Sequence, residues 1–317
     1  MNVVQYLARR LLGLAVVLWL TSTTVFILLR VIPGDPVQIV AGLGIVDAAA
    51  LHKLRSALGL DQPIAVQYAI WLAHLLRGDL GVSLRSGTPV VSLIAQALPI
   101  TLELAALALL AGITMSVLLG VAAARRRRRI GDLLITSGAL AGISLPSFVL
   151  ALLSIYLVSV KLRLLPTGGF VPLSQDPAQN LKLMILPAIT LGTGTAGILV
   201  RMMRRNLIDV SGEDYIRTAR AKGLSPRRVI YRHAMRNAVI PYVTIAGLEA
   251  GALLSGAVIT ERIFAIPGMG QLMMLNIAER DYPVVQGCVL VVAALYVAVN
   301  FVIDLLYAWL DPRMAVR

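Results

Sequence analysis

Apolar stretches long enough to cross a membrane alternate with polar segments along the chain. A helix needs about 20 mostly apolar residues to span the hydrocarbon core of a bilayer. The stretches that qualify are residues 11–30, 98–124, 133–160, 183–202, 238–260 and 284–308. They lack the strict alternation of a membrane β-strand, and a helix satisfies its own backbone hydrogen bonds in lipid. The pattern predicts an all-α polytopic membrane protein with about six transmembrane helices.

Composition supports this reading, because 58% of the 317 residues are hydrophobic and only 14% are charged. Soluble domains carry roughly 25% charged residues. The first stretch is longer than the core of a signal peptide and lacks a small-residue cleavage site before "RVIPGDP", so we expect it to be retained. A net charge of +13 in such a chain is typical of basic cytoplasmic loops.

The basic residues gather in alternate loops, and this pattern predicts the orientation. They are Arg9 and Arg10, the run "RRRRR" at 125–129, the segment 201–236, and Arg313 and Arg317. The intervening loops, 31–97, 161–182 and 261–283, hold fewer. The positive-inside rule then places both termini in the cytoplasm. The arginine run is interpreted as a topology anchor beside anionic membrane lipid.

The segment "DYIRTARAKGLSPRRVIYRHAMRNAVIP" lies in the long loop between the fourth and fifth stretches. Ser211 and Asp214 resemble a weak capping box before a first short helix, and Gly223 is placed for a left-handed C-cap. Ser225 and Pro226 suit the start of a second helix. Its expected apolar stripe is Val229, Ile230, Ala234, Ala238 and Val239. Both ends are tied to membrane helices, so we expect no nucleic acid to bind here.

This segment resembles the cytoplasmic loop of permeases of binding-protein-dependent ABC importers. Their general motif is Glu-Ala-Ala, three residues and Gly, and Arg217 stands here in place of the Glu, followed by Thr218, Ala219 and Gly223. That departure, and the later position of Pro241, are similar to the dipeptide, oligopeptide and nickel branch. Further similar segments are "YLARRLLGL", "FILLRVIPGDPV", "LGLDQPIAVQYAIWL", "RGDLGVSLRSGTPV", "ITERIFAIPGMGQLMMLNIAERDYPVVQG" and "FVIDLLYAWLDPRM".

The resemblance implies a type I ABC importer permease that works only in a complex. The implied partners are a second homologous permease, two ATP-binding subunits that carry the ATP and Mg²⁺, and an extracytoplasmic substrate-binding protein. The short helix of the loop would dock in a cleft of one ATPase subunit, and Ala219 would let it approach closely. The residues assigned to this coupling are Tyr215, Arg217, Thr218, Ala219, Arg220, Ala221, Lys222 and Gly223.

Catalytic chemistry is not indicated by the sequence. There is no phosphate-binding G-x-x-x-x-G-K-[ST] motif, so we expect no ATPase activity and no bound cofactor in this chain. The histidines show no metal-ligand spacing, and the single cysteine excludes an intrachain disulfide. Ser144 and Ser147 beside Pro146 are interpreted as helix-packing or kink residues.

Glu249, in the middle of the fifth stretch, is the candidate for the translocation path. A carboxylate at that depth is costly and should face the protein interior or a water path, so a buried structural hydrogen bond is the competing interpretation. Gly247 and Gly251 on the same helix predict close helix packing. Glu103 and Asp304 lie near the ends of their stretches and are interpreted as structural.

Two regions are expected along the chain. Residues 1–97 would hold the first span and a long extracytoplasmic loop, and residues 98–317 a core permease domain with five spans and the coupling loop 203–237. Within the outer loop, "DAAALHKLRSALGL" and "PIAVQYAIWLAHLL" show helical spacing and predict short helices along the outer surface.

Several classes of cargo fit a permease with these features. Peptides are the main hypothesis for a multi-pass inner-membrane permease of this kind. Nickel chelates are the alternative within the family, followed by opines or glutathione. A stand-alone secondary transporter and a non-transport membrane scaffold are the alternatives from other classes, although the broken helices and intramembrane charges typical of secondary transporters are not evident.

Overall fold

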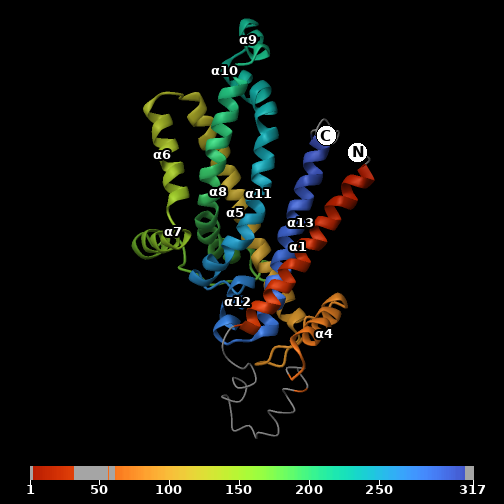
Figure 1. Cartoon of the computed structure of the whole chain (residues 1–317). Helices are drawn as coiled ribbons and strands as arrows, with labels where there is room; N and C mark the ends of the chain where they lie inside the picture. Colours follow the sequence, from red (N-terminus) through yellow and green to blue (C-terminus); the bar gives the residue numbers. More distant parts are fainter. Residues whose placement is uncertain (1–2, 32–55, 57–60, 311–317) are drawn as a thin grey trace. The chain divides into compact units, whose positions relative to one another are not determined.

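The computed structural model describes residues 3–31, 56 and 61–310, and these residues are helical apart from their connections (Figure 1). The only β pairing among them is an isolated antiparallel bridge between Val82 and Pro89. The elements are α1 Val3–Val31, α4 Ile64–Leu76, α5 Val90–Arg125, α6 Ile130–Ser144, α7 Ser147–Ser154, η1 Ile155–Lys161, α8 Pro177–Val210, α9 Asp214–Ala221, α10 Pro226–Arg228, η2 Val229–Ala234, α11 Met235–Ile263, α12 Met269–Ala278 and α13 Tyr282–Leu310.

Four described helices are long and apolar enough to cross a membrane: α5, α8, α11 with the turns before it, and α13. The bent pair formed by α6 and the helix after it could provide a fifth span. Helix α1 has 29 residues, or about 44 Å at 1.5 Å per residue. The all-α membrane fold is confirmed, and the number of spans agrees roughly with the expected six.

The described residues form two compact units. The first comprises Thr101–Ile266 and the part of α13 from Tyr296 onward. The second comprises α1, α4, the start of α5 as far as Ile100, and Pro267–Leu295. Two helices, α5 and α13, therefore contribute to both units. The predicted division near residue 97 stays a prediction.

Helix α8 is the most buried of the long helices and forms the centre of the first unit. Asp176 is its N-cap residue, and the side chain of Asp176 accepts hydrogen bonds from the N–H groups of Ala178 and Gln179. Gly192 on α8 lies so close to Ala108 of α5 that a Cβ atom there would collide with the neighbouring backbone. Small residues thus allow α5 and α8 to pack with their backbones in near contact.

The predicted span 133–160 is not a single straight helix. Helix α6 ends at Ser144, and the helix that begins at Ser147 leaves at an angle of 108°. Pro146 precedes the second helix in an extended conformation, with φ of −57° and ψ of 139°. A proline disfavours the helical conformation at the residue before it, and Leu145 is indeed extended. The interpretation of this site as a kink is confirmed, but the expectation of one uninterrupted span was wrong.

The fifth span begins earlier than predicted. The helix that contains it runs continuously from Pro226 to Ile263, with a π-helical section at Val229–Ala234. Pro241, expected where the span enters the membrane, lies inside α11. The loop's second helix and the fifth span are therefore one element, so a displacement at Pro226 can be transmitted along the helix.

The second unit has its own core, where α5 begins beside α12 and α13. The buried residues are Val90, Ile94, Ala97, Met269, Val284 and Cys288. The turn before α5 is fastened to the turn between α12 and α13, because the Ser83 hydroxyl donates to Asp281 at 2.6 Å and Arg85 forms an ion pair with Glu279. This connection orders the loop that leads into α5.

Candidate functional site: the loop helix α9 and the carboxylate of α11

The loop helix α9 follows α8 after a single turn. Ser211 does not cap α9 as the sequence predicted, because it ends α8 and its hydroxyl donates to the Leu207 carbonyl at 2.5 Å. Glu213 is the N-cap residue of α9, and its side chain makes no capping bond. The short connection Ser211–Glu213 leaves α9 little freedom relative to α8.

Helix α9 buries one narrow face and exposes the rest. Ile216 is fully buried and Ala219 is 6% exposed, and both belong to a core cluster with residues of α5, α8, η2 and α11. Ile216 was not among the predicted site residues, although it is an apolar residue on an otherwise polar helix. The role predicted for Ala219, close approach to a partner's pocket, is not what this packing indicates, because Ala219 faces the chain's own core.

The remaining predicted coupling residues form the exposed surface of α9 and its C-terminal turn. They are Tyr215, Arg217, Thr218, Arg220, Ala221, Lys222 and Gly223. The Tyr215 hydroxyl accepts a hydrogen bond of 2.7 Å from Asn237 at the start of α11. The guanidinium group of Arg217 lies 3.3 Å from the carboxylate of Asp214 in the same helix. The structure thus presents a short cationic helix at the end of the α8 and α11 pair (Figure 1).

Gly223 ends this helix in the left-handed region, with φ of 78°, as the sequence predicted. Its N–H donates to the Arg220 carbonyl at 2.9 Å, and the N–H of Leu224 donates to the Ala219 carbonyl at 3.4 Å. A Cβ atom at Gly223 would meet nothing within 4 Å. Glycine is therefore required by the backbone conformation rather than by lack of space.

The second half of the loop also follows the prediction. Ser225 caps α10 by accepting a hydrogen bond from the N–H of Arg228, with Pro226 at the first helical position. Of the predicted apolar stripe, Val229, Ala234 and Ala238 are buried, while Ile230 and Val239 pack against the same cluster. This stripe and the buried face of α9 therefore share one core.

A partly buried ion pair connects α8 to α6 below this region. The Arg204 guanidinium of α8 donates two hydrogen bonds to the Asp132 carboxylate of α6, at 2.5 and 2.7 Å. Asp132 also accepts from the N–H of Arg128 at 3.0 Å and is only 5% exposed. A bidentate pair fixes orientation as well as distance. Residues 72 positions apart give no local signal, so this pair was not predicted from the sequence.

Glu249 is half-buried on α11, and the Thr195 hydroxyl of α8 donates to it at 3.2 Å. It therefore points toward the helices of the first unit, as expected for a carboxylate at this depth. The predicted close packing at Gly247 and Gly251 is confirmed, because Cβ atoms there would lie 2.7 Å from Ile303 and 3.1 Å from Tyr296 of α13.

Two other carboxylates differ from their predicted surroundings. Glu261, expected in an outer loop, lies in the last turn of α11, is fully buried and accepts a 2.6 Å hydrogen bond from the Thr101 hydroxyl. Glu103 lies well inside α5, which begins at Val90, rather than near a span end. Both differences arise because the helices extend beyond the apolar stretches that predicted them. The side chain of Asp304 lies outside the described residues.

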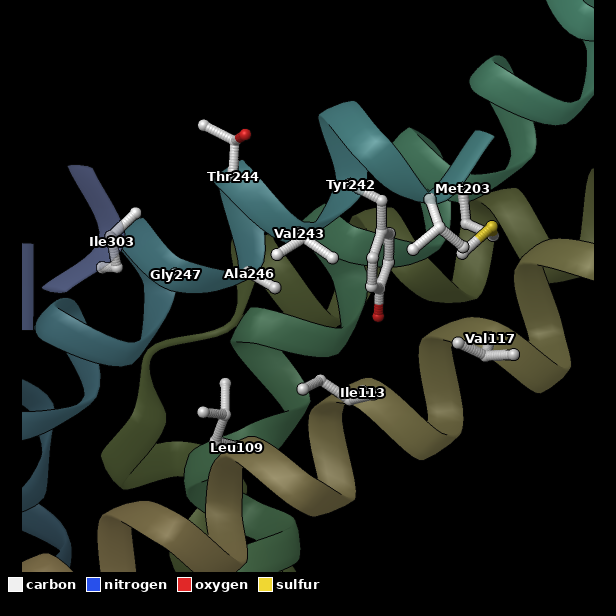
Figure 2. A pocket seen from close by; sticks show the side chains of 11 residues that line it. Leu109, Ile113, Val117, Met203, Tyr242, Val243, Thr244, Ala246, Gly247 and Ile303 are labelled. Carbon is white, nitrogen blue, oxygen red and sulfur yellow. The ribbon is translucent and has the colours of Figure 1, made fainter. Parts of the chain in front are cut away.

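A cavity of about 420 Å³ lies between α5, α8, α11 and the last part of α13. Its lining is almost entirely hydrocarbon, from residues such as Leu109, Ile113, Val243 and Ile303. Figure 2 shows the Tyr242 ring reaching toward α5, where its hydroxyl bonds Ser116 at 2.6 Å. The cavity offers no arrangement suited to acid–base or nucleophilic catalysis.

The fold places the chain in a class of proteins. One chain of a solved structure titled "Inward facing conformations of the MetNI methionine ABC transporter" matches it with a TM-score of 0.55 over 70% of this chain and 97% of that chain. The two are 17% identical, so the likeness concerns the fold alone. The fold is that of the membrane-spanning subunit of an ABC transporter.

The chain belongs to the family described as "Binding-protein-dependent transport system inner membrane component", whose model matches residues 116–316. The model for the N-terminal part of such components matches residues 3–105. The family resemblance predicted from the loop and the flanking segments is therefore confirmed, and the chain is a transport permease component of the inner membrane.

Relatives of this chain align over almost its whole length. A protein of Brucella suis biovar 1, whose name describes a peptide transport system permease, is 42% identical over 94% of this chain and 95% of its own length. The glutathione transport system permease protein GsiC of Salmonella typhimurium is 39% identical over 98% of both chains.

Proposed function

We propose that this chain is one permease subunit of an ATP-driven importer of short peptides, and that α9 is its contact with the ATPase. The observation that carries the proposal is the construction of α9. Its cationic surface is exposed while Ile216 seats it in the core of the spanning helices. A helix fixed to the spans yet open to a partner can transmit displacement without sliding.

The complex would contain a second homologous permease, two ATP-binding subunits and an extracytoplasmic substrate-binding protein. ATP and Mg²⁺ would be bound by the ATP-binding subunits, since this chain has no phosphate-binding motif. When the ATPase pair closes, it would push on α9. The displacement would pass into α8 through the short turn at 211–213 and into α11 through the continuous helix from Pro226.

Both termini and α9 would lie on the cytoplasmic side. The arginine run 125–129, between α5 and α6, and the basic α9 region lie at the same end of the first unit, because α5 and α8 both end there. The positive-inside rule supports this orientation. A water-soluble thiol reagent added outside intact cells should label Ser174→Cys but not Thr218→Cys, and the reverse pattern would contradict the orientation.

The cargo is proposed to be a short peptide because of the names of the two relatives described above. Glutathione, itself a peptide, belongs in the same assay. Nickel chelates and opines are the alternatives that uptake measurements can separate, although neither appears in the names of those relatives. The assay is uptake of labelled peptides, glutathione and nickel into vesicles that contain the complete importer. ATP-independent uptake driven by a proton or sodium gradient would instead support a secondary transporter.

The coupling role of α9 is tested at Gly223. Gly223→Val places a β-branched residue at a positive φ, at a cost of about 1–2 kcal/mol, and should misdirect the end of α9. We expect normal amounts of membrane protein, retained ATP hydrolysis and strongly reduced uptake in reconstituted vesicles. Gly223→Asn is the matched control, because asparagine tolerates this conformation. Equal uptake by both variants would contradict the assignment.

Glu249 is proposed to line the translocation path. Glu249→Gln keeps the shape and the hydrogen bond with Thr195 but removes the charge. We expect a changed apparent affinity or rate across a series of peptides that differ in charge, with ATPase binding unaffected. Thr195→Val, which removes only the bond, is the control for a structural role. Unchanged uptake of the whole series by Glu249→Gln would leave Glu249 as a structural residue.

A further inference from the structure

The exposed surface of α4 is unusual for a helix outside the spans. Helix α4 has 13 residues and buries none of them completely. Residues on one side of it are exposed and carry only hydrocarbon: Ala65, Val66, Ala69, Ile70, Ala73 and Leu76. Contiguous exposed apolar surface of this kind marks contact with a membrane or another protein.

The opposite side of α4 is fastened to the last part of α1. The Tyr68 hydroxyl and the Thr23 hydroxyl are hydrogen-bonded at 2.7 Å, and the Arg30 guanidinium donates to Gln67 at 3.0 Å. The rings of Tyr68 and Trp71 lie 5.1 and 5.3 Å from the ring of Phe26, which is 1% exposed.

These contacts fix the depth of α4. Thr23 and Phe26 belong to the apolar stretch Leu12–Leu28 of α1, whereas Arg30 lies just beyond it. Helix α4 is therefore held where the apolar part of α1 gives way to polar residues. Tyrosine and tryptophan are enriched at this boundary, because an apolar ring and a polar group meet both environments there.

Helix α4 is too short to cross the membrane. Its 13 residues extend about 20 Å, against about 30 Å for the hydrocarbon core. Polar residues close both ends, with Asp61 and Gln62 before it and Arg77 after it. In the last turn of α4, the His74 imidazole lies 2.9 Å from the carboxylate of Asp79, which follows the helix. Hydrogen bonds from the Gly81 N–H and His74 lower the pKa of Asp79. Charged ends suit a helix that stays in the interface.

We propose that α4 lies in the outer membrane interface with this apolar face in contact with lipid. The occupant is the bilayer rather than a protein, because α4 is fastened to α1, and Val16, Leu20 and Ile27 of that apolar helix also expose hydrocarbon. Helix α4 thereby anchors the described segment that leads from Arg77 into α5 to the membrane surface.

The test measures the depth of fluorescent labels in the complete importer, in vesicles of phosphatidylcholine and phosphatidylglycerol. Cys288, the chain's single cysteine, is first replaced by alanine, and bimane is attached to Ala69→Cys or Ala73→Cys. Gln62→Cys provides a water-exposed control and Leu20→Cys a membrane-embedded one. Lipids brominated at different acyl positions and aqueous iodide are the quenchers.

Labels at residues 69 and 73 should lie about 5–10 Å below the headgroup surface and be shielded from iodide. The label at residue 62 should be quenched by iodide alone. Iodide quenching at 69 and 73 equal to that at 62 would overturn the proposal by showing that the face meets water. Shielding from both iodide and brominated lipid would also overturn it, because a protein would then cover the face.

Discussion

Helices α9 and α4 are both short, lie outside the spans and are each fastened to a long helix, yet their surfaces are opposite in kind. Helix α9 buries Ile216 and Ala219 and exposes arginine, lysine and threonine. Helix α4 is held by polar and aromatic contacts and exposes hydrocarbon. The difference teaches that attachment alone does not define a role, since the exposed face decides whether a helix meets a soluble partner or lipid.

The largest effect is expected where α9 is seated. Ile216→Asp would place an uncompensated charge in a fully buried position, at a cost of roughly 3–5 kcal/mol. We expect α9 to detach from the core cluster, so that uptake is lost and proteases cut between residues 211 and 224. For protease protection, Thr218→Asp is the matched control, because it introduces the same charge on the exposed side of the same helix. Intact protease protection in Ile216→Asp would show that burial does not hold α9.

The next effect concerns the support beneath α9. Arg204→Met leaves the Asp132 carboxylate buried without its bidentate partner and should lower the stability of the importer by as much as about 3 kcal/mol. Arg205→Met is the control, because Arg205 is exposed and lies 3.8 Å from Asp209, a pair worth at most about 1 kcal/mol. Thermal unfolding in lipid nanodiscs measures the stability of both variants. Similar losses of stability would mean that the ion pair between Arg204 and Asp132 does not hold α8 against α6.

The smallest effect compares the same substitution on both exposed faces. Ala73→Asp would place a charge against lipid and should destabilise the protein by less than the roughly 2.5–3.5 kcal/mol found at a membrane centre. Ala221→Asp on α9 faces water and should cost no more than about 1 kcal/mol, from the unfavourable helix dipole. The measurement is unfolding in nanodiscs, and equal stability of the two variants would remove the distinction between the faces.

Local chemistry made much of the loop predictable. Glycine at a helix end, followed by Ser225 and Pro226, predicts the observed C-cap and the next helix because these conformations depend on neighbouring residues. The failed capping box at Ser211 shows the limit of such signals. A serine at a helix end can bond backward to a carbonyl as readily as forward to an N–H, and here it bonds Leu207.

Contacts between distant segments could not be predicted in the same way. The sequence indicated that a carboxylate at Glu249 is costly in lipid, but it did not indicate that Thr195 is its hydrogen-bond partner. Asp132, Arg204 and Ile216 were not predicted as functional residues. Glu261 was assigned to a loop because hydropathy ends a span where a charged residue type begins, whereas the fold buries this carboxyl group and gives it Thr101 as a hydrogen-bond partner.

By itself, the sequence determined that the chain is a helical membrane protein, which loops are basic, and where α9 turns at Gly223, because hydropathy and backbone conformation act locally. Only the tertiary structure decided that α6 and α7 meet at 108°, that Ala219 faces inward and that α4 exposes hydrocarbon. Those properties depend on which distant surfaces pack together, and a linear pattern does not specify that choice.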